Sequence, residues 1–346
     1  MGISPVIVDD NVNFFWHGAE KVQLLGDFNN WGRDKSPSEF QPESPNLWKC
    51  RFKIPTDSYI EYAYLQNGER FPDPLNPFQV NDGIGHTNSS FWMPNAIDTP
   101  LARPQPDVAQ GVVSTQTVVT SYFVAGPDRT IYLYQPPVSQ PVPLVVVLDG
   151  KDYLERAQLT TIVDNLIAQG RIQPIALAMV SPAKMERQAE YACSDTTVAF
   201  ILDRVMPIAQ ANFNLLDITK APGAYCMMGA SMGGLMSFYT ALRAPEIFGK
   251  VLCQSGAFGA HLPVYHLYNR SVIEDLIRYC PAPPLKLWLD CGIYEWFIEP
   301  NRQMHALLQE RGYDHSYLEH NSGHNYPSWR NVLWKGLEWL FPPQSI

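Results

Sequence analysis

The stretch that decides the fold runs from Tyr225 to Leu235 and reads YCMMGASMGGL. An apolar, strand-like run leads into GASMG at 229–233, and a helix-permissive segment follows directly. This pattern is typical of a nucleophile elbow, in which a serine lies on a tight turn between a strand and a helix. The small residues Gly229 and Gly233 let the chain make that turn without a side-chain clash. Ser231 is therefore the candidate nucleophile.

A serine hydroxyl is a weak nucleophile at neutral pH, so it needs a base to take its proton and backbone amides to bind the oxyanion. A strand-to-helix turn can place the hydroxyl where both are available. The alternative interpretation is a glycine-rich turn with an incidental serine, because Gly and Ser are common in turns. The apolar strand before Ser231, the apolar helix after it, and Gly234 where helix and sheet would pack all favour the elbow.

The rest of the chain after residue 110 alternates apolar strand-like runs with helical patterns. Residues 111–123 and 130–134 predict two antiparallel strands, and the unbroken apolar run at 143–150 predicts a central strand buried on both faces. Alternation of strand and helix implies a mostly parallel sheet with helices on both faces. With a serine elbow in its middle, this pattern predicts the α/β-hydrolase fold.

The general base comes last in chain order in this fold. His324 lies in SGHN at 322–325, after the last expected strand and before the last expected helix, and Gly323 lets the backbone bend there. These features favour His324 as the base. The other histidines considered are His261 and His266 in an expected surface insertion, and His315 and His320 at the ends of a strand.

The acid that orients the histidine should lie between the nucleophile and the base. Asp290 ends an expected strand, Glu295 follows in GIYE at 292–295, and Glu299 begins an expected helix. Glu299 fits an N-terminal helix position, where the helix dipole stabilises a carboxylate. Asp290 has the alternative role of accepting hydrogen bonds from backbone amides. We favour Glu295 and keep Asp290 as the alternative acid.

The first hundred residues contain short strand-like runs separated by turns, with no helical period between them. Such spacing predicts a small antiparallel β-sandwich of the immunoglobulin type. Residues 94–106 are rich in proline and have no period, which is typical of a stiff, semi-extended linker. We therefore predict a β-sandwich at 1–94, a linker at 95–109 and a catalytic domain at 110–346.

Motifs in the β-rich part resemble the immunoglobulin-like glycogen-binding module that precedes many glycan-active enzymes. They are GDFNNW at 26–31, YAYLQNG at 62–68, DP at 73–74 and GIGHTNS at 83–89. The resemblance implies that Trp31 stacks on sugar and that Asn88 supports it. Arg70 and Ala63 stand where binding members of that family carry a second tryptophan and a lysine. We therefore favour a structural module that helps to wall the cleft, with Trp31 as a core or interdomain aromatic.

Motifs along residues 110–341 resemble the esterase D group, which includes enterochelin esterases, feruloyl and acetylxylan esterases and mycolyltransferases. They are LDGK at 148–151, RQAEY at 187–191, GASMGG at 229–234, APEIFG at 244–249, QSGA at 254–257, GIYE at 292–295 and GHNYPSWR at 323–330. The preceding module, and the Trp329-Arg330 pair after the histidine, are most similar to those of enterochelin esterases.

This resemblance implies Ser231 as nucleophile, His324 as base and Glu295 as acid. It also implies an oxyanion hole formed by the amides of Met232 and Lys151. Glu295 stands where many of these esterases carry aspartate, and either carboxylate can orient a histidine.

Composition bounds the possible partners. The 346 residues carry a formal net charge of −9, which disfavours nucleic acid or an anionic membrane surface. The start of the chain lacks the pattern of a signal peptide and no apolar run approaches a membrane span, so we expect a cytoplasmic protein. The six cysteines are scattered and indicate neither a metal nor a redox site. We expect a small-molecule ester as partner and no cofactor, and the sequence does not indicate an oligomeric state.

The expected reaction is ester hydrolysis through an acyl-enzyme, with a siderophore triester as the first candidate substrate. An esterase acting on feruloyl or acetyl sugar esters is the alternative, and a non-catalytic glycan-binding protein is an alternative of another class. An anionic ferric catecholate would need basic side chains near the cleft. The candidate substrate-binding residues are Arg187, Trp329 and Arg330, with Lys184 and Arg302 as further sources of positive charge.

Overall fold

The computed structural model describes residues 4–33, 37–83, 85–183, 186–259 and 271–343. Its contacts divide the chain into two compact units. The first comprises Met1–Asp98 and two later segments, Gly292–Ile298 and Glu319–Ser328. The second comprises the remaining residues, Thr99–Cys291, Glu299–Leu318 and Trp329–Ile346.

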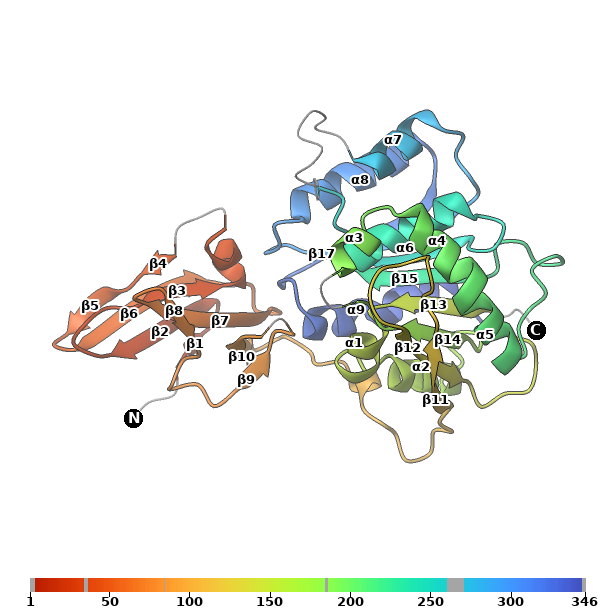
Figure 1. Ribbon diagram of the computed structural model, residues 1–346. Helices are drawn as coiled ribbons and strands as arrows, with labels where there is room; N and C mark the ends of the chain where they lie inside the picture. The colour runs from red at the N-terminus through yellow and green to blue at the C-terminus, as the bar shows by residue number, and fades with distance from the viewer. Residues whose placement is uncertain (1–3, 34–36, 84, 184–185, 260–270, 344–346) are drawn as a thin grey trace. The chain divides into compact units, whose positions relative to one another are not determined.

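The N-terminal residues of the first unit form two antiparallel sheets, drawn in red to orange in Figure 1. One has the order β1-β2-β6-β5 and the other β4-β3-β7-β10-β9, with β8 paired to β7. This confirms the all-β module predicted from the sequence. The elements are β1 (Val6–Val8), β2 (Asn11–His17), β3 (Gln23–Gly26), η1 (Asp27–Gly32), β4 (Ser38–Glu39), β5 (Gln41–Ser44), β6 (Leu47–Lys53), β7 (Tyr59–Gln66), β8 (Glu69–Phe71), β9 (Gln79–Asn81) and β10 (Thr87–Trp92).

Side chains from both sheets form the core of this module. Phe14 of β2 packs against Tyr62 of β7 and Phe91 of β10, with ring centroids 4.9 and 6.0 Å apart. The hydroxyls of Tyr62 and Tyr64 both donate to Oδ2 of the buried Asp73, at 2.8 and 2.9 Å. The polar ends of these large side chains therefore keep hydrogen-bond partners inside the core.

The second unit is built on an eight-stranded sheet with the order β11-β12-β14-β13-β15-β16-β17-β18. β11 pairs antiparallel with β12 and β12 with β14, whereas the pairs from β14 to β17 are parallel. All five residues of β13 are buried, as the apolar run predicts. The strands are β11 (Val112–Val118), β12 (Arg129–Gln135), β13 (Leu144–Leu148), β14 (Ala176–Val180), β15 (Cys226–Ala230), β16 (Lys250–Gln254), β17 (Lys286–Gly292) and β18 (Asp314–His320).

Helices connect the strands of this sheet, so the α/β-hydrolase fold predicted from the sequence is confirmed (Figure 1). None of the helices in the described ranges is both long enough and apolar enough to cross a bilayer. The helical elements are η2 (Pro100–Ala102), α1 (Gly150–Glu155), α2 (Leu159–Ala168), α3 (Arg187–Glu190), α4 (Asp195–Phe200), η3 (Ile201–Val205), α5 (Met206–Asn212), α6 (Met232–Arg243), α7 (Val272–Tyr279), α8 (Ile298–Glu310) and α9 (Tyr326–Leu340).

Part of the proline-rich segment is fixed to the second unit. Asn165 of α2 donates through Nδ2 to the carbonyl oxygens of Leu101 and Arg103, at 2.7 and 3.0 Å. The amide of Thr99 donates to Oδ1 of Asn331 in α9 at 3.0 Å. Residues 99–103 are therefore anchored through their backbone.

Candidate active site

Ser231 lies on the turn between β15 and α6, with φ 58° and ψ −125°. A positive φ is sparsely populated by residues other than glycine, and such strain persists only where the surroundings hold it. The amide of Ser231 donates to the carbonyl of Gln254 at 2.8 Å, and its carbonyl accepts from Ala257 at 3.1 Å and from Leu235 at 3.0 Å. The backbone on both sides of the strained residue is therefore bonded to its neighbours.

Gly229, the first of the two glycines that flank the serine, is required by a close backbone approach. A Cβ atom on Gly229 would lie 2.5 Å from both the carbonyl carbon and the oxygen of Gly233. Because these atoms belong to the backbone, they cannot move aside without opening the turn. The tight turn therefore depends on glycine at position 229, as the sequence pattern predicts.

The two predicted oxyanion-hole amides belong to the first turns of two helices. Met232 is the first residue of α6, and Lys151 is the second residue of α1. Amides in the first turn of a helix have no carbonyl partner within that helix, so they can donate to an anion. Their role in binding an oxyanion remains a prediction.

Arg187 holds the segment that precedes Lys151. Its Nε and Nη2 donate to Oδ1 and Oδ2 of Asp149 at 2.6 and 2.5 Å, and Asp149 is the N-terminal flanking residue of α1. Burial raises the pKa of the Asp149 carboxyl, although the hydrogen bonds from Arg187 act in the opposite direction. This bidentate pair ties α3 to the start of α1.

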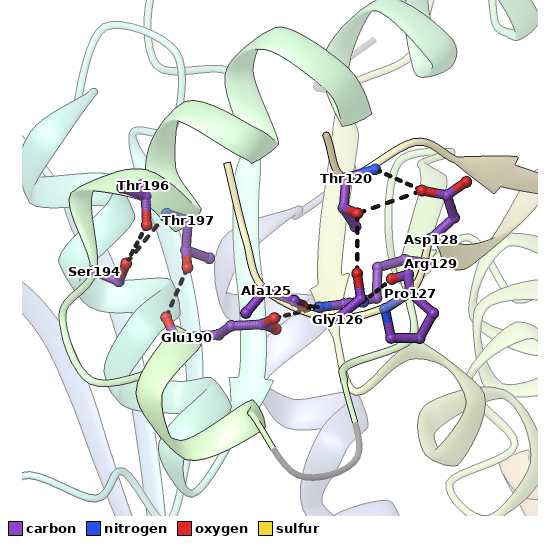
Figure 2. A network of polar contacts seen from close by, with 10 residues as sticks. All are labelled: Thr120, Ala125, Gly126, Pro127, Asp128, Arg129, Glu190, Ser194, Thr196 and Thr197. Atoms are coloured by element: carbon purple, nitrogen blue, oxygen red, sulfur yellow. Dashed lines mark hydrogen bonds and ion pairs between the residues drawn. The ribbon is translucent and has the colours of Figure 1, made fainter. Parts of the chain in front are cut away.

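A second ion pair fixes α3 itself, as Figure 2 shows. Arg129 of β12 is 3% exposed, and its guanidinium binds the carboxylate of Glu190 at the end of α3. The same guanidinium donates to the carbonyl oxygens of Ala125 and Pro127, and Thr197 donates through Oγ1 to the Glu190 carbonyl at 2.8 Å. Both ends of α3 are therefore bound to neighbouring elements.

His324 and Glu295 form a hydrogen-bonded pair within the first unit. Nδ1 of His324 lies 2.5 Å from Oε2 of Glu295, whose side chain is fully buried. Oε1 of Glu295 accepts from the amide of Gly292 at 2.8 Å, which orients the carboxylate. When Nδ1 of a neutral imidazole donates to a carboxylate, Nε2 is the nitrogen that can accept a proton.

The alternative acid Asp290 has other partners. It is fully buried in β17, and its Oδ2 accepts from Nε1 of Trp288 at 2.8 Å and from Nε2 of Gln254 at 3.2 Å. Ser231 and Asp290 belong to the second unit, whereas Glu295 and His324 belong to the first. The carboxylate of the other candidate acid, Glu295, binds the imidazole of the predicted base.

The Esterase family model matches residues 124–340. The chain belongs to the Esterase family. Iron(III) salmochelin esterase of Escherichia coli is 24% identical to this family member over an alignment of 359 residues, which covers 94% of this chain and 86% of that protein. Iron(III) enterobactin esterase of Dickeya dadantii is 29% identical over 227 residues, which cover 62% of this chain and about half, 52%, of that protein.

A solved structure has the same fold as this Esterase family chain. Ferric enterobactin esterase from Salmonella typhimurium superposes with a TM-score of 0.79 at 19% identity, covering 96% of this chain and 94% of that one. The similarity extends over both the all-β module and the α/β-hydrolase part, because it covers nearly the whole length of each chain.

Two aromatic residues directly after Glu295 were not among the predicted site residues of this Esterase family member. The rings of Trp296 and Phe297 lie 4.6 and 5.6 Å from the His324 ring, centroid to centroid. The guanidinium carbon of Arg33 lies 3.7 Å from the centroid of the Trp296 ring. The available signal was the run YEWF at 294–297, which places two aromatics directly after the predicted acid.

Two of the predicted substrate-binding side chains have structural partners in this Esterase family chain. Trp329 is buried in α9 and donates through Nε1 to Oγ of Ser255 at 2.7 Å. Arg187 binds Asp149, as described above. Arg330 is half-buried at the next position of α9.

The remaining candidates are also placed. Arg302 binds Glu299 at 2.5 Å, His315 and His320 lie near the two ends of β18, and no group of three or more metal-ligating side chains occurs in the described ranges. Lys184, His261 and His266 lie outside the described residues.

The two candidate glycan-binding residues are part of the module's own polar network. Nε1 of Trp31 donates to Oδ1 of Asp27 at 2.9 Å, and the guanidinium of Arg70 lies over the Trp31 ring at 4.1 Å. Asn88 is 1% exposed, donates to Oε2 of Glu61 at 2.8 Å and accepts from Arg70. A sugar could reach Asn88 only after these groups had separated, which supports the structural role favoured above.

Proposed function

We propose that this chain is a serine esterase that hydrolyses a carboxylic ester through an acyl-enzyme on Ser231. The strained backbone of Ser231 at the β15 to α6 turn carries the proposal, because this conformation projects a serine hydroxyl from the turn in nucleophile elbows. Membership of the Esterase family supports the reaction class, and the hydrogen bond from His324 to Glu295 supports an oriented base.

In the proposed first step, Nε2 of His324 takes the proton of Ser231 while Oγ attacks the ester carbonyl carbon. The amides of Met232 and Lys151 donate to the oxyanion that forms. When this intermediate collapses, the carbon–oxygen bond to the alcohol breaks and His324 gives its proton to the departing alkoxide. Glu295 holds the tautomer with hydrogen on Nδ1 and stabilises the imidazolium.

In the second step, His324 takes a proton from water, and the hydroxide attacks the acyl carbon. The bond between this carbon and Oγ then breaks, His324 returns the proton to Oγ, and the carboxylic acid departs. Water is the only co-reactant that this sequence consumes.

We propose a catecholate siderophore ester as the substrate class. The supporting observation is that the relatives named above are siderophore esterases and that one of them matches over 94% of this chain. Arg187 and Arg302 are each bound to a carboxylate, so they contribute little unpaired positive charge to bind an anionic substrate. This predicts that the metal-free triester is cleaved at least as well as its ferric complex.

The first test combines chemical labelling with turnover. Intact mass is measured after incubation with a fluorophosphonate, beside turnover of short p-nitrophenyl esters, for wild type, Ser231→Ala and His324→Ala. We expect one adduct and turnover for wild type, no adduct for Ser231→Ala, and a loss of kcat of at least about 10³-fold for His324→Ala. Unchanged labelling or turnover in Ser231→Ala would overturn the proposal.

The second test concerns the substrate. Purified protein is incubated with a catecholate triester, with and without ferric ion, and separately with feruloyl and acetyl sugar esters. We expect cleavage of the triester with a kcat/KM well above that of the sugar esters. Turnover of sugar esters with an intact triester would replace the siderophore proposal with the sugar-ester alternative.

A further inference from the structure

Asp27 is a buried carboxyl group of the N-terminal module. It is the first residue of η1, directly after β3, and is 2% exposed. Its Oδ2 accepts from the amide of Glu61 in β7 at 2.8 Å, and its Oδ1 accepts from Nε1 of Trp31 at 2.9 Å. The carboxyl group is therefore held in one orientation by two N–H donors.

The same carboxyl group lies against the backbone that carries His324. A Cβ atom on Gly323 would lie 2.1 Å from both Cγ and Oδ1 of Asp27, so the carboxyl occupies the space of a side chain at position 323. Nδ2 of Asn325 lies 3.5 Å from Oδ2 of Asp27. Asp27 thus contacts the residues on both sides of His324, which belong to the same compact unit.

Other groups of the module hold the ends of this loop. Oγ of Ser322 donates to the carbonyl of Tyr59 at 2.8 Å, and Nδ2 of Asn321 donates to Oδ1 of Asp57 at 2.7 Å. Oδ1 of Asn325 accepts from Oγ of Ser328 at 2.6 Å, which closes the loop on itself. The contact with Asp27 lies between these fixed ends, at the two residues that flank His324.

We propose that Asp27 is a positioning residue for the catalytic base: by packing on Gly323, it sets the backbone of the loop so that His324 keeps its hydrogen bond to Glu295. This inference rests on the proposed function, because it assigns a partner to His324 as general base. A displacement of a catalytic group by about 1 Å can cost about 10²-fold in rate. The contact is therefore expected to appear in kcat.

The protonation state of Asp27 agrees with this role. Burial, followed by the charge of Glu61, raises the pKa of Asp27 to about 8, so the group is mostly neutral at pH 7. A neutral Asp27 does not compete with Glu295 for the imidazolium. The titratable and charged groups that act on Asp27, or on which it acts, are Tyr59 and Glu61 of β7, Arg70 of β8, and Tyr294 and Glu295 of the 292–298 segment.

The experiment compares four variants by kcat, KM, fluorophosphonate labelling rate and thermal unfolding. They are Asp27→Ala, Gly323→Ala, the double variant of both, and Asp27→Asn. The first two should each lower kcat at pH 7 by about 10²-fold with KM nearly unchanged. In the double variant the new methyl group enters the space that the carboxyl leaves, so kcat should recover at least tenfold over Gly323→Ala.

Asp27→Asn provides the conservative rescue. Asparagine keeps the shape and the neutral state, and its oxygen can still accept from Glu61, whereas its NH2 group cannot accept from Trp31. Because the contact with Gly323 is kept, most of kcat should remain at pH 7. It cannot ionise, so the fall in kcat that accompanies ionisation of Asp27 near pH 8 in the wild type should be absent. This pH profile is a readout that a purely structural role would not change.

The matched control is Asp73→Asn, which replaces another buried carboxyl group of the same module. This change weakens the hydrogen bonds that Asp73 accepts from Tyr62 and Tyr64. We expect lower stability but unchanged kcat per folded molecule. If Asp27→Ala behaves like this control, or if Asp27→Asn keeps the wild-type pH profile, the inference is wrong. Activity in Ser231→Ala or His324→Ala would instead overturn the proposed function, so the two failures are distinguishable.

Discussion

At the scale of single residues, three buried carboxyl groups of the first unit have different tasks. Glu295 binds the imidazole of His324, and Glu61 accepts from the side chain of Asn88 at 2.8 Å. Asp27 accepts from neutral donors, and burial raises its pKa to about 8. Desolvation disfavours the charged form of a buried carboxyl group, so Asp27 keeps its proton. A protonated Asp27 carries no charge and therefore does not repel the other two carboxylates.

Protonation of Asp27 predicts how stability depends on pH. The folded state keeps a proton on this group up to about pH 8, whereas the unfolded chain releases it near the ordinary aspartate pKa of 3.8. The contribution of Asp27 to the unfolding free energy is therefore fully present below about pH 4 and is lost as pH rises through 8. Urea unfolding at pH 5.5 and pH 8 should show a smaller fall in unfolding free energy for Asp27→Asn than for wild type. Equal falls in the two proteins would contradict the assigned protonation.

At the scale of elements, the sequence predicts the turn at Ser231 well because its signals are local. An apolar run, two glycines and a helical pattern lie within twenty residues of one another. The partners of Trp329 and Arg187 are distant: Ser255 precedes Trp329 by 74 residues, and Asp149 precedes Arg187 by 38. A pattern along the chain does not reveal such pairs, so these side chains looked available for substrate.

The role of α3 can be tested through the same pair. Arg187→Ala should leave the buried carboxylate of Asp149 without its bidentate partner and loosen the segment that ends at Lys151. If this segment supplies an oxyanion donor, kcat should fall about tenfold or more while KM changes little. Arg187→Lys keeps the charge but loses the bidentate geometry, so its kcat should lie between those of wild type and Arg187→Ala. A rise in KM alone would show that Arg187 binds substrate, as the sequence suggested.

At the scale of the whole molecule, the first unit is discontinuous in sequence. The sequence predicts three consecutive parts, at 1–94, 95–109 and 110–346, because composition and period change at those points. The contacts group Gly292–Ile298 and Glu319–Ser328 with Met1–Asp98 in one compact unit. The bond from Ser322 to Tyr59 joins residues 263 positions apart, and local periodicity carries no signal of that pairing. Glu295 and His324 therefore belong to the same compact unit as a module that was expected only to wall the cleft.

This grouping predicts that the β-rich core and the catalytic loops unfold together. Phe14 is fully buried and packs against rings of both sheets, so Phe14→Ala should lower the unfolding free energy by about 3–5 kcal/mol. Activity in the absence of denaturant should stay near wild type, because the rings packed against Phe14 are those of Phe28, Phe52, Tyr62 and Phe91 in the β-rich module. The urea concentration that abolishes ester turnover should fall. Phe78→Ala, at a side chain that is 67% exposed in the same unit, is the matched control and should change neither quantity. If turnover persisted at urea concentrations where the aromatic core had already unfolded, Glu295 and His324 would be held independently of the module.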